Sequence, residues 1–290
     1  MIISVENKYL KISIEEKGAE LRSVINKETG LEYMWSGDPA FWGKTSPILF
    51  PIVGTLMRDS YWYKNKLYIL TRHGFARDSM FQTVDKTDDT VTFSLLSTPA
   101  TREKYPFDFE LRILYRLMAN TLEVSYRVIN RQKENLYFSV GAHPAFKIPL
   151  IDGTSYEDYY LQFEKIEDLK RWPISREGLI KSEPISLLND TSVLKLTRHL
   201  FDEDALVFKH LKSEKISIKS TAHPHGLDFY FDGFPYLGIW AAKNADFVCI
   251  EPWCGIADSE SHDQQLISKE GINKISENES WTRRWKITSY

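Results

Sequence analysis

Apolar and polar side chains alternate one by one along much of this chain. The clearest run is residues 122–128, where single polar residues separate Leu122, Val124, Tyr126 and Val128. Successive side chains of a β-strand point to opposite faces, so this pattern predicts half-buried strands. The same alternation is found over residues 10–15, 91–95, 216–218 and 227–231.

Turn-forming residues separate several of these runs. Lys64-Asn65-Lys66 lies between YWY and LYIL, and Ala119-Asn120 lies between LRILYRLM and TLEVSYRV. Both arrangements predict β-hairpins. Residues 281–287 (WTRRWKI) predict a last strand. The chain is therefore expected to be an antiparallel all-β protein.

Evidence for helices is sparse. Residues 151–172 are the best candidate for another structure, although alternation occurs there too, and short helical turns are expected at 38–42 and 199–203. We find no repeat or Pro/Gly/Ser linker, so residues 1–290 are predicted to form a single domain. A flat sheet of so many strands would curl or split, which predicts two stacked sheets in a large β-sandwich.

The charge balance and the cysteines limit the possible partners and location. The chain has 37 basic and 40 acidic residues, a net charge of −3, which argues against binding nucleic acid or an anionic membrane. We find no apolar run long enough for a membrane span and no signal peptide in the first 20 residues, so we expect a cytoplasmic protein. Cys249 and Cys254 are then expected to be reduced and buried.

The segment Thr71–Asp78 (TRHGFARD) directly follows a predicted strand. It places His73 and Arg77 in a loop, where functional groups are often found. A solvated turn with an Arg–Asp ion pair would explain the same residues.

A second segment, residues 140–146 (VGAHPAF), surrounds His143 with small and apolar residues. Desolvation lowers the pKa of a histidine and lets it exchange a proton near neutrality. The alternative is a core histidine that hydrogen-bonds a backbone carbonyl.

The third segment, residues 247–253 (FVCIEPW), ends a strongly apolar run at Glu251. Glutamate is seldom buried without a partner, and apolar surroundings raise its pKa toward the range of a general base. A strand-end glutamate paired with an arginine is the alternative. The remaining histidines are expected to be solvated, and His223-Pro-His225 is only a weak metal signal; they are His199, His210, His223, His225 and His262.

The three segments HGFARD, GAHPAF and IEPWCGIAD, in this order, resemble the aldose 1-epimerase (galactose mutarotase) superfamily, and most of all its bacterial LacX-like branch. SPILFPIVG, LFDEDALVF and FPYLGIW extend the resemblance over nearly the whole chain. The resemblance implies a galactose mutarotase-like supersandwich with an open cleft for a monosaccharide, and it implies no cofactor or metal.

The resemblance also implies roles for individual residues. Glu251 would take the proton from the C1 hydroxyl of a hexose or hexose phosphate, and His143 would protonate the ring oxygen. The ring then opens, the C1 carbonyl rotates, and reclosure yields the other anomer. Further residues implied to contact the sugar are His73, Asp204, Arg58 and Trp253, of which Trp253 is equally well explained as a core residue.

This sequence departs from the family pattern at its substrate arginine. Well-studied mutarotases carry an arginine directly after the glycine, whereas here Gly54 is followed by Thr55 and the arginine comes at Arg58. Arg77 is an alternative source of positive charge. Arg58, Arg72 and Arg77 together could bind a phosphate through guanidinium contacts.

Two other functions are compatible with these residues. His73, His143 and Glu251 could form a two-histidine, one-carboxylate metal site. Alternatively, the chain could be a non-catalytic sugar-binding or sensing protein on the same fold. For the favoured interpretation we expect a monosaccharide or sugar phosphate as the ligand, and a monomer or homodimer.

Overall fold

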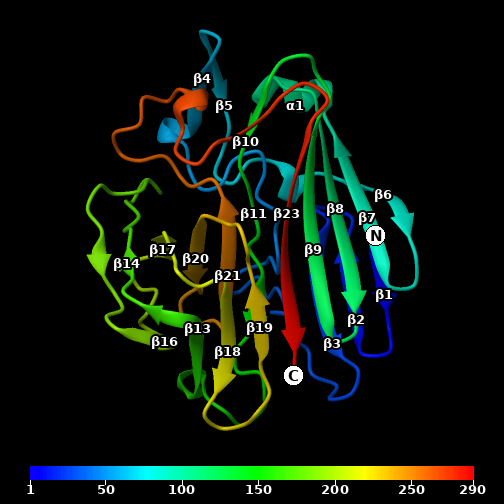
Figure 1. Cartoon of the computed structure of the whole chain (residues 1–290), viewed down its shortest axis with the longest axis vertical. Coiled ribbons are helices and arrows are strands. Elements are labelled where there is room, and N and C mark those ends of the chain that lie inside the picture. Colours follow the sequence, from blue (N-terminus) through cyan, green and yellow to red (C-terminus); the bar gives the residue numbers. More distant parts are fainter.

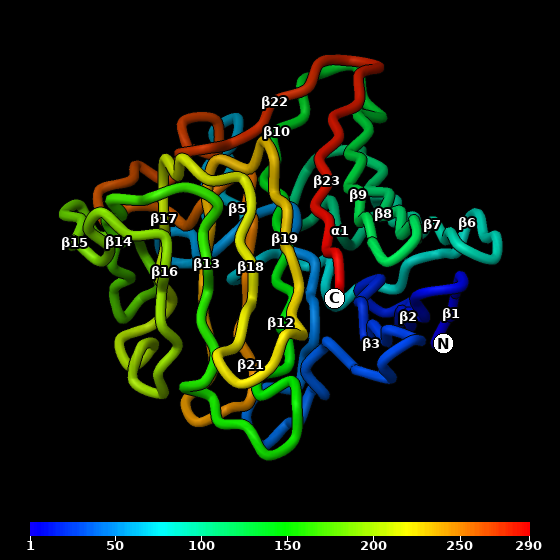
Figure 2. Tube along the Cα trace, turned by 60° about the horizontal axis from the view of Figure 1, so that its bottom comes forward, coloured from blue at the N-terminus to red at the C-terminus, as the bar shows by residue number.

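The computed structural model describes residues 1–290 and confirms the all-β prediction. Its largest element is a nine-stranded antiparallel sheet in the order β16-β13-β18-β19-β23-β9-β8-β7-β6, which crosses the front of Figure 2. The strands are β6 (Gln82–Lys86), β7 (Thr90–Leu96), β8 (Phe109–Met118), β9 (Thr121–Asn130), β13 (Tyr159–Glu167), β16 (Thr191–Lys195), β18 (Lys215–Ser220), β19 (Leu227–Tyr230) and β23 (Ser280–Ser289).

A second layer packs against this sheet. It includes a five-stranded sheet in which β21 pairs with β11, β12 and β20, and β20 pairs with β17. Phe146 on β12 contacts Phe229 on β19 across the interface, with ring centroids 5.8 Å apart, and Figure 2 shows β12 and β21 behind the large sheet. These strands are β11 (Val140–Gly141), β12 (Ala145–Lys147), β17 (Leu206–Lys209), β20 (Tyr236–Trp240) and β21 (Phe247–Cys254). The predicted stacking of sheets is confirmed.

Smaller sheets complete the molecule (Figure 1). Strands β1, β2 and β3 form a three-stranded sheet, and three strand pairs are β4–β5, β10–β22 and β14–β15. Their bounds are β1 (Ile2–Glu6), β2 (Leu10–Glu15), β3 (Glu20–Asn26), β4 (Ser60–Tyr63), β5 (Lys66–Ile69), β10 (Leu136–Phe138), β14 (Lys170–Arg171), β15 (Ile185–Ser186) and β22 (Asn273–Ile275).

Both predicted hairpins are present. Lys64 and Asn65 form the two-residue turn between β4 and β5, with φ angles of 49° and 60°. Such left-handed turns match the twist of the strands that they join. Ala119-Asn120 forms the two-residue turn between β8 and β9, with only Ala119 at a positive φ, 52°. The predicted last strand is β23.

Helices are few and short. The only α-helix is α1 (Pro99–Lys104), and single 3-10 turns occur at Met57–Asp59, Ala76–Asp78, Tyr156–Asp158 and Leu266–Ser268. The 151–172 stretch forms one of these turns and then strand β13, whereas 38–42 and 199–203 are hydrogen-bonded turns. None of the helices has the length and apolar character to span a bilayer.

The two faces of strand β21 pack in different hydrophobic clusters. Its even-numbered residues Val248, Ile250 and Cys254 join a cluster of 64 buried residues between the layers. The odd-numbered Cys249 and Trp253 instead belong to two small clusters on the other face. Both cysteines are free and buried, as predicted.

Candidate active site

Glu251 lies on the outer face of β21, between Cys249 and Trp253. The strand has neighbours on both edges and cover on both faces, so all eight of its residues are buried and Glu251 is only 2% exposed. The carboxyl group nevertheless lines a pocket of about 520 Å³. This is within the size range of small-molecule sites, about 300–1,000 Å³.

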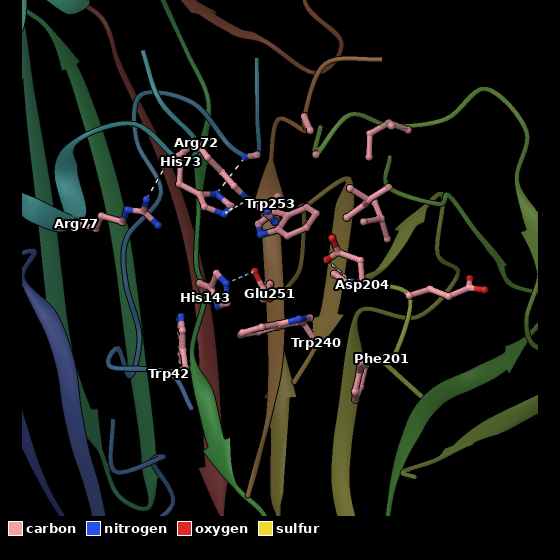
Figure 3. A pocket seen from close by; sticks show the side chains of 18 of the residues that line it. Trp42, Arg72, His73, Arg77, His143, Phe201, Asp204, Trp240, Glu251 and Trp253 are labelled. Carbon is pink, nitrogen blue, oxygen red and sulfur yellow. Dashed lines mark hydrogen bonds and ion pairs between the residues drawn. The ribbon is translucent and has the colours of Figure 1, made fainter. Parts of the chain in front are cut away.

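His143 lies beside Glu251 because residues 140–147 run antiparallel to β21 and pair with it in two short strands. Gly141 on β11 pairs with Trp253, and Ala145 on β12 pairs with Cys249, so His143 lies between the two paired segments. Its Nε2 atom is 3.3 Å from Oε2 of Glu251 (Figure 3). Two groups about 108 residues apart in the chain are thus within hydrogen-bonding reach.

The surroundings of this pair disfavour charge on both partners. Burial raises the pKa of Glu251 well above its usual range; Asp204 acts in the same direction and Arg72 opposes it. Burial also lowers the pKa of His143 to about 3. Burial therefore favours a protonated carboxyl beside a neutral imidazole, and the pair holds one exchangeable proton.

Aromatic rings enclose the imidazole of His143. Trp42 stacks on it with ring centroids 4.9 Å apart, and Trp240 approaches it edge-on at 5.8 Å. These rings keep water from that side of the pair. Neither tryptophan was predicted from the sequence, in which the high aromatic content, 13%, was the only available signal.

His73 reaches the same pocket, with its ring edge-on to His143 at 5.9 Å. The backbone N–H of Gly54 donates to its Nδ1 at 3.1 Å, and the Nε–H of Arg72 donates to its Nε2 at 3.2 Å. A neutral imidazole carries its proton on one of these two nitrogens, so it accepts only one of these hydrogen bonds at a time. Burial, more than the nearby cationic groups, lowers the pKa of His73 well below its usual range, so the pocket is lined here by a neutral imidazole beside the Arg72 guanidinium.

The predicted arginines are placed differently. Arg77 lines the pocket, half-buried, and donates to the carbonyl oxygen of Arg72 at 3.0 Å. Arg58 lies in the exposed Met57–Asp59 turn with a φ of 57° and does not line the pocket. The substrate contact expected of Arg58 has no support from this position, whereas Arg72 lines the pocket.

Asp204 lies on the wall opposite the arginines (Figure 3). Its φ of 129° is rare for a residue with a side chain, and its Oδ1 accepts the N–H of Ala205 at 2.6 Å. Such strain persists only where the surrounding structure enforces it. The pocket thus has basic and acidic walls on either side of the Glu251–His143 pair.

The indole of Trp253 lies flat between two glycines of the neighbouring strands. A Cβ on Gly141 or Gly238 would come within 2.6 Å or 2.4 Å of the ring. Trp253 is only 6% exposed, packs in a small apolar cluster and also lines the pocket. Both roles considered for it are therefore compatible with its position.

Gly238→Ala is expected to lower the free energy of unfolding by about 1–3 kcal/mol, because the added methyl overpacks the space that holds the Trp253 ring. Chemical denaturation would measure this. Gly43→Ala is the matched control, since its Cβ would meet no atom nearer than 3.8 Å. Equal stability of the two variants would contradict tight packing of Trp253.

The donor atoms that lie close together differ from the metal site considered as an alternative, which comprised His73, His143 and Glu251. His143, Cys249 and Glu251 have ligand atoms within 4.8 Å of one another, whereas His73 is not part of this group. Nε2 of His223 hydrogen-bonds to the Tyr159 hydroxyl at 2.8 Å.

The prediction that His262 is solvated is wrong. Its side chain is only 11% exposed and lies 3.7 Å from Asp258.

By its fold and its pocket, the chain is a large antiparallel β-sandwich protein in which a carboxyl–imidazole pair lines an open pocket. More particularly, the chain belongs to the aldose 1-epimerase family, whose model, "Aldose 1-epimerase", matches residues 1–264. It is 33% identical to the chromosomal protein LacX of Lactococcus lactis subsp. lactis, over 99% of both chains.

Solved structures show the same similarity. A galactose mutarotase related enzyme from Lactobacillus acidophilus is 34% identical, with a TM-score of 0.95 over 100% of this chain and 97% of that one. A galactose mutarotase-like protein from Lactobacillus casei is 32% identical, with a TM-score of 0.94 over 100% of both chains. The predicted supersandwich fold is therefore confirmed.

Proposed function

We propose that this chain is an aldose 1-epimerase that interconverts the α and β anomers of a hexose or hexose phosphate. The observation that carries the proposal is the contact of 3.3 Å between Nε2 of His143 and Oε2 of Glu251, at the base of a sugar-sized pocket. The family membership of the chain supports the same reaction class.

Anomer exchange needs one proton acceptor and one proton donor. The Glu251 carboxylate takes the proton of the C1 hydroxyl, the C1–O5 bond breaks, and O5 takes the proton of the His143 imidazolium. The product is a free aldehyde. After rotation about the C1–C2 bond, His143 recovers the O5 proton, the ring closes, and Glu251 returns its proton to O1.

The proton count of the pair fits this cycle. It holds one proton throughout, on the imidazole before ring opening and on the carboxyl group after it. Burial favours the second distribution, so the hydroxyl groups of a bound sugar must help to stabilise the first. Both distributions are needed, because each is the starting point for one direction of the ring reaction.

The walls of the pocket supply contacts to the rest of the sugar. We assign the ring-oxygen region to His73 and Arg72, the hydroxyls on the opposite side to Asp204, and one face of the ring to Trp253. Arg77 extends the basic wall and is the candidate for contact with a phosphate.

The test is an anomer-exchange assay by NMR or polarimetry over free and 6-phosphorylated hexoses, aldoses and ketoses. At least one sugar should exchange faster than its uncatalysed rate by several orders of magnitude. Sugar binding without acceleration would overturn the proposal and select the non-catalytic sugar-binding alternative.

Arg77→Ala is expected to weaken use of a phosphorylated sugar about tenfold or more, with a much smaller effect on the neutral sugar. Hydrogen bonds to charged groups contribute about 1.5–3 kcal/mol each. Comparison of kcat/KM for the two sugars measures this, and Arg58→Ala, outside the pocket, is the control. Equal losses for both sugars would exclude phosphate binding by Arg77.

Other features remain predictions of the sequence. A single domain over residues 1–290 is supported by the core cluster of 64 residues, which runs from Val5 to Ile287. The monomer or homodimer state and the cytoplasmic location rest on the sequence alone.

A further inference from the structure

Cys249 lies directly beside the proposed catalytic pair but has no part in the proposed reaction. It precedes Glu251 by two residues on the same face of β21, and it is fully buried. One nitrogen of His143, the sulfur of Cys249 and one oxygen of Glu251 all lie within 4.8 Å of one another. We propose that these three side chains form an inhibitory binding site for a thiophilic divalent cation of the Zn²⁺ type.

The spacing of the donors suits such an ion. Zinc binds histidine nitrogen and carboxylate oxygen at about 2.0–2.1 Å, which places these two atoms about 3.3 Å apart in a tetrahedral site. The Nε2 of His143 and Oε2 of Glu251 are 3.3 Å apart. A zinc-bound sulfur would lie about 3.6 Å from each of them. The sulfur of Cys249 lies within 4.8 Å of both partners, so a small movement of the thiol toward them completes three ligands.

The donor types select among metals. A nitrogen, sulfur and oxygen set suits zinc and related ions, whereas magnesium and calcium take oxygen ligands. His143 and Glu251 line the pocket, so an ion can enter from that side, where a water molecule can serve as its fourth ligand. Binding requires a thiolate and a carboxylate and therefore releases protons.

The inhibitory effect of the ion rests on the proposed function. An ion bound to Nε2 of His143 and Oε2 of Glu251 would block both atoms that transfer protons in the proposed reaction. A bound ion therefore stops anomer exchange. Cys249 acts only through the metal. Replacement of Cys249 leaves the carboxyl–imidazole pair intact, so Cys249→Ala is expected to keep its exchange activity.

The chain offers a matched control in Cys254. It is the other free cysteine, it lies on the same strand and is also buried, but it belongs to the main core on the opposite face of the sheet. It cannot join the cluster without reversal of the strand. Cys254→Ala should therefore keep the metal sensitivity that Cys249→Ala loses.

The experiment titrates the chelator-treated full chain with Co²⁺ as a spectroscopic probe and with Zn²⁺ in the exchange assay. We expect one equivalent of Co²⁺ to produce a near-ultraviolet thiolate-to-cobalt band, and Zn²⁺ to inhibit exchange. Cys249→Ala should lose the band and resist Zn²⁺ by at least about tenfold. Cys249→Ser, which keeps a small polar group, is measured alongside it in case the alanine variant does not fold.

The outcomes separate the two proposals. No cobalt band in the natural chain, or an equal band in both Cys249 variants, overturns the metal site while the epimerase assay stands. A band that disappears in the Cys249 variants and persists in Cys254→Ala supports the site. If that pattern is found but the chain accelerates anomer exchange of none of the sugars, the metal site is supported and the proposed function is contradicted.

Discussion

Glu251→Gln is expected to slow anomer exchange by about 10²–10⁴-fold, the usual contribution of a positioned acid–base group, and at the same time to stabilise the folded chain near pH 8. Glutamine keeps the shape of the side chain, but its amide neither takes up nor releases a proton near neutral pH. The activity loss follows because the C1 hydroxyl then has no acceptor for its proton.

The gain in stability follows from the raised pKa of Glu251 in the folded chain. In the unfolded chain the carboxyl ionises above its ordinary value of 4.5, so folding at higher pH must either take up a proton or bury a charge. A raised folded-state pKa contributes stability that is complete below the unfolded pKa and is lost as the pH rises. Glutamine escapes this loss, so the difference in melting temperature between variant and natural chain should grow from pH 5 to about pH 8.

Glu203→Gln is the matched control for both effects. Glu203 also lines the pocket, but its carboxylate is 74% exposed and paired with Arg171. Its replacement should change neither the exchange rate nor the pH dependence of stability to a comparable degree. Near-normal activity of Glu251→Gln would remove Glu251 from the mechanism, and a melting difference independent of pH would contradict a buried, protonated carboxyl.

The fold was predictable because its signals are local. Alternation over 122–128 reports a strand from a few neighbouring side chains, and Lys64-Asn65 reports a hairpin from one turn. The order of nine strands in the large sheet is not local. It joins β19 to β23, about 50 residues further along the chain, and no pattern within either strand specifies that pairing.

The site was predictable where a single segment carried the chemistry. Glu251 and His143 each interrupt an apolar run, and that contrast is visible in the sequence. Trp42 and Trp240 could not be found this way, because what matters is their contact with His143, which only the assembled sheets create. The substrate contact predicted for Arg58 rested on its proximity to Gly54 in the sequence. That proximity does not specify the direction in which a turn carries the side chain.

His143→Asn is expected to lower the exchange rate by a factor similar to that of Glu251→Gln, about 10²–10⁴. An asparagine amide can still occupy the space beneath Trp42 and hydrogen-bond to Glu251, but it cannot give a proton to O5 or take one back. Exchange measured by NMR at saturating sugar tests this directly. His199→Asn is the control, because its side chain is 87% exposed in a surface turn.

The double variant Glu251→Gln, His143→Asn gives the sharper test of how the two groups work. If they pass one proton through the same C1–O5 unit, loss of either group already ends the cycle, and the double variant should be no slower than the worse single variant. Groups that contributed independently would instead multiply their losses, to about 10⁴–10⁸. A multiplied loss would mean that the 3.3 Å contact between the two side chains is not a functional unit.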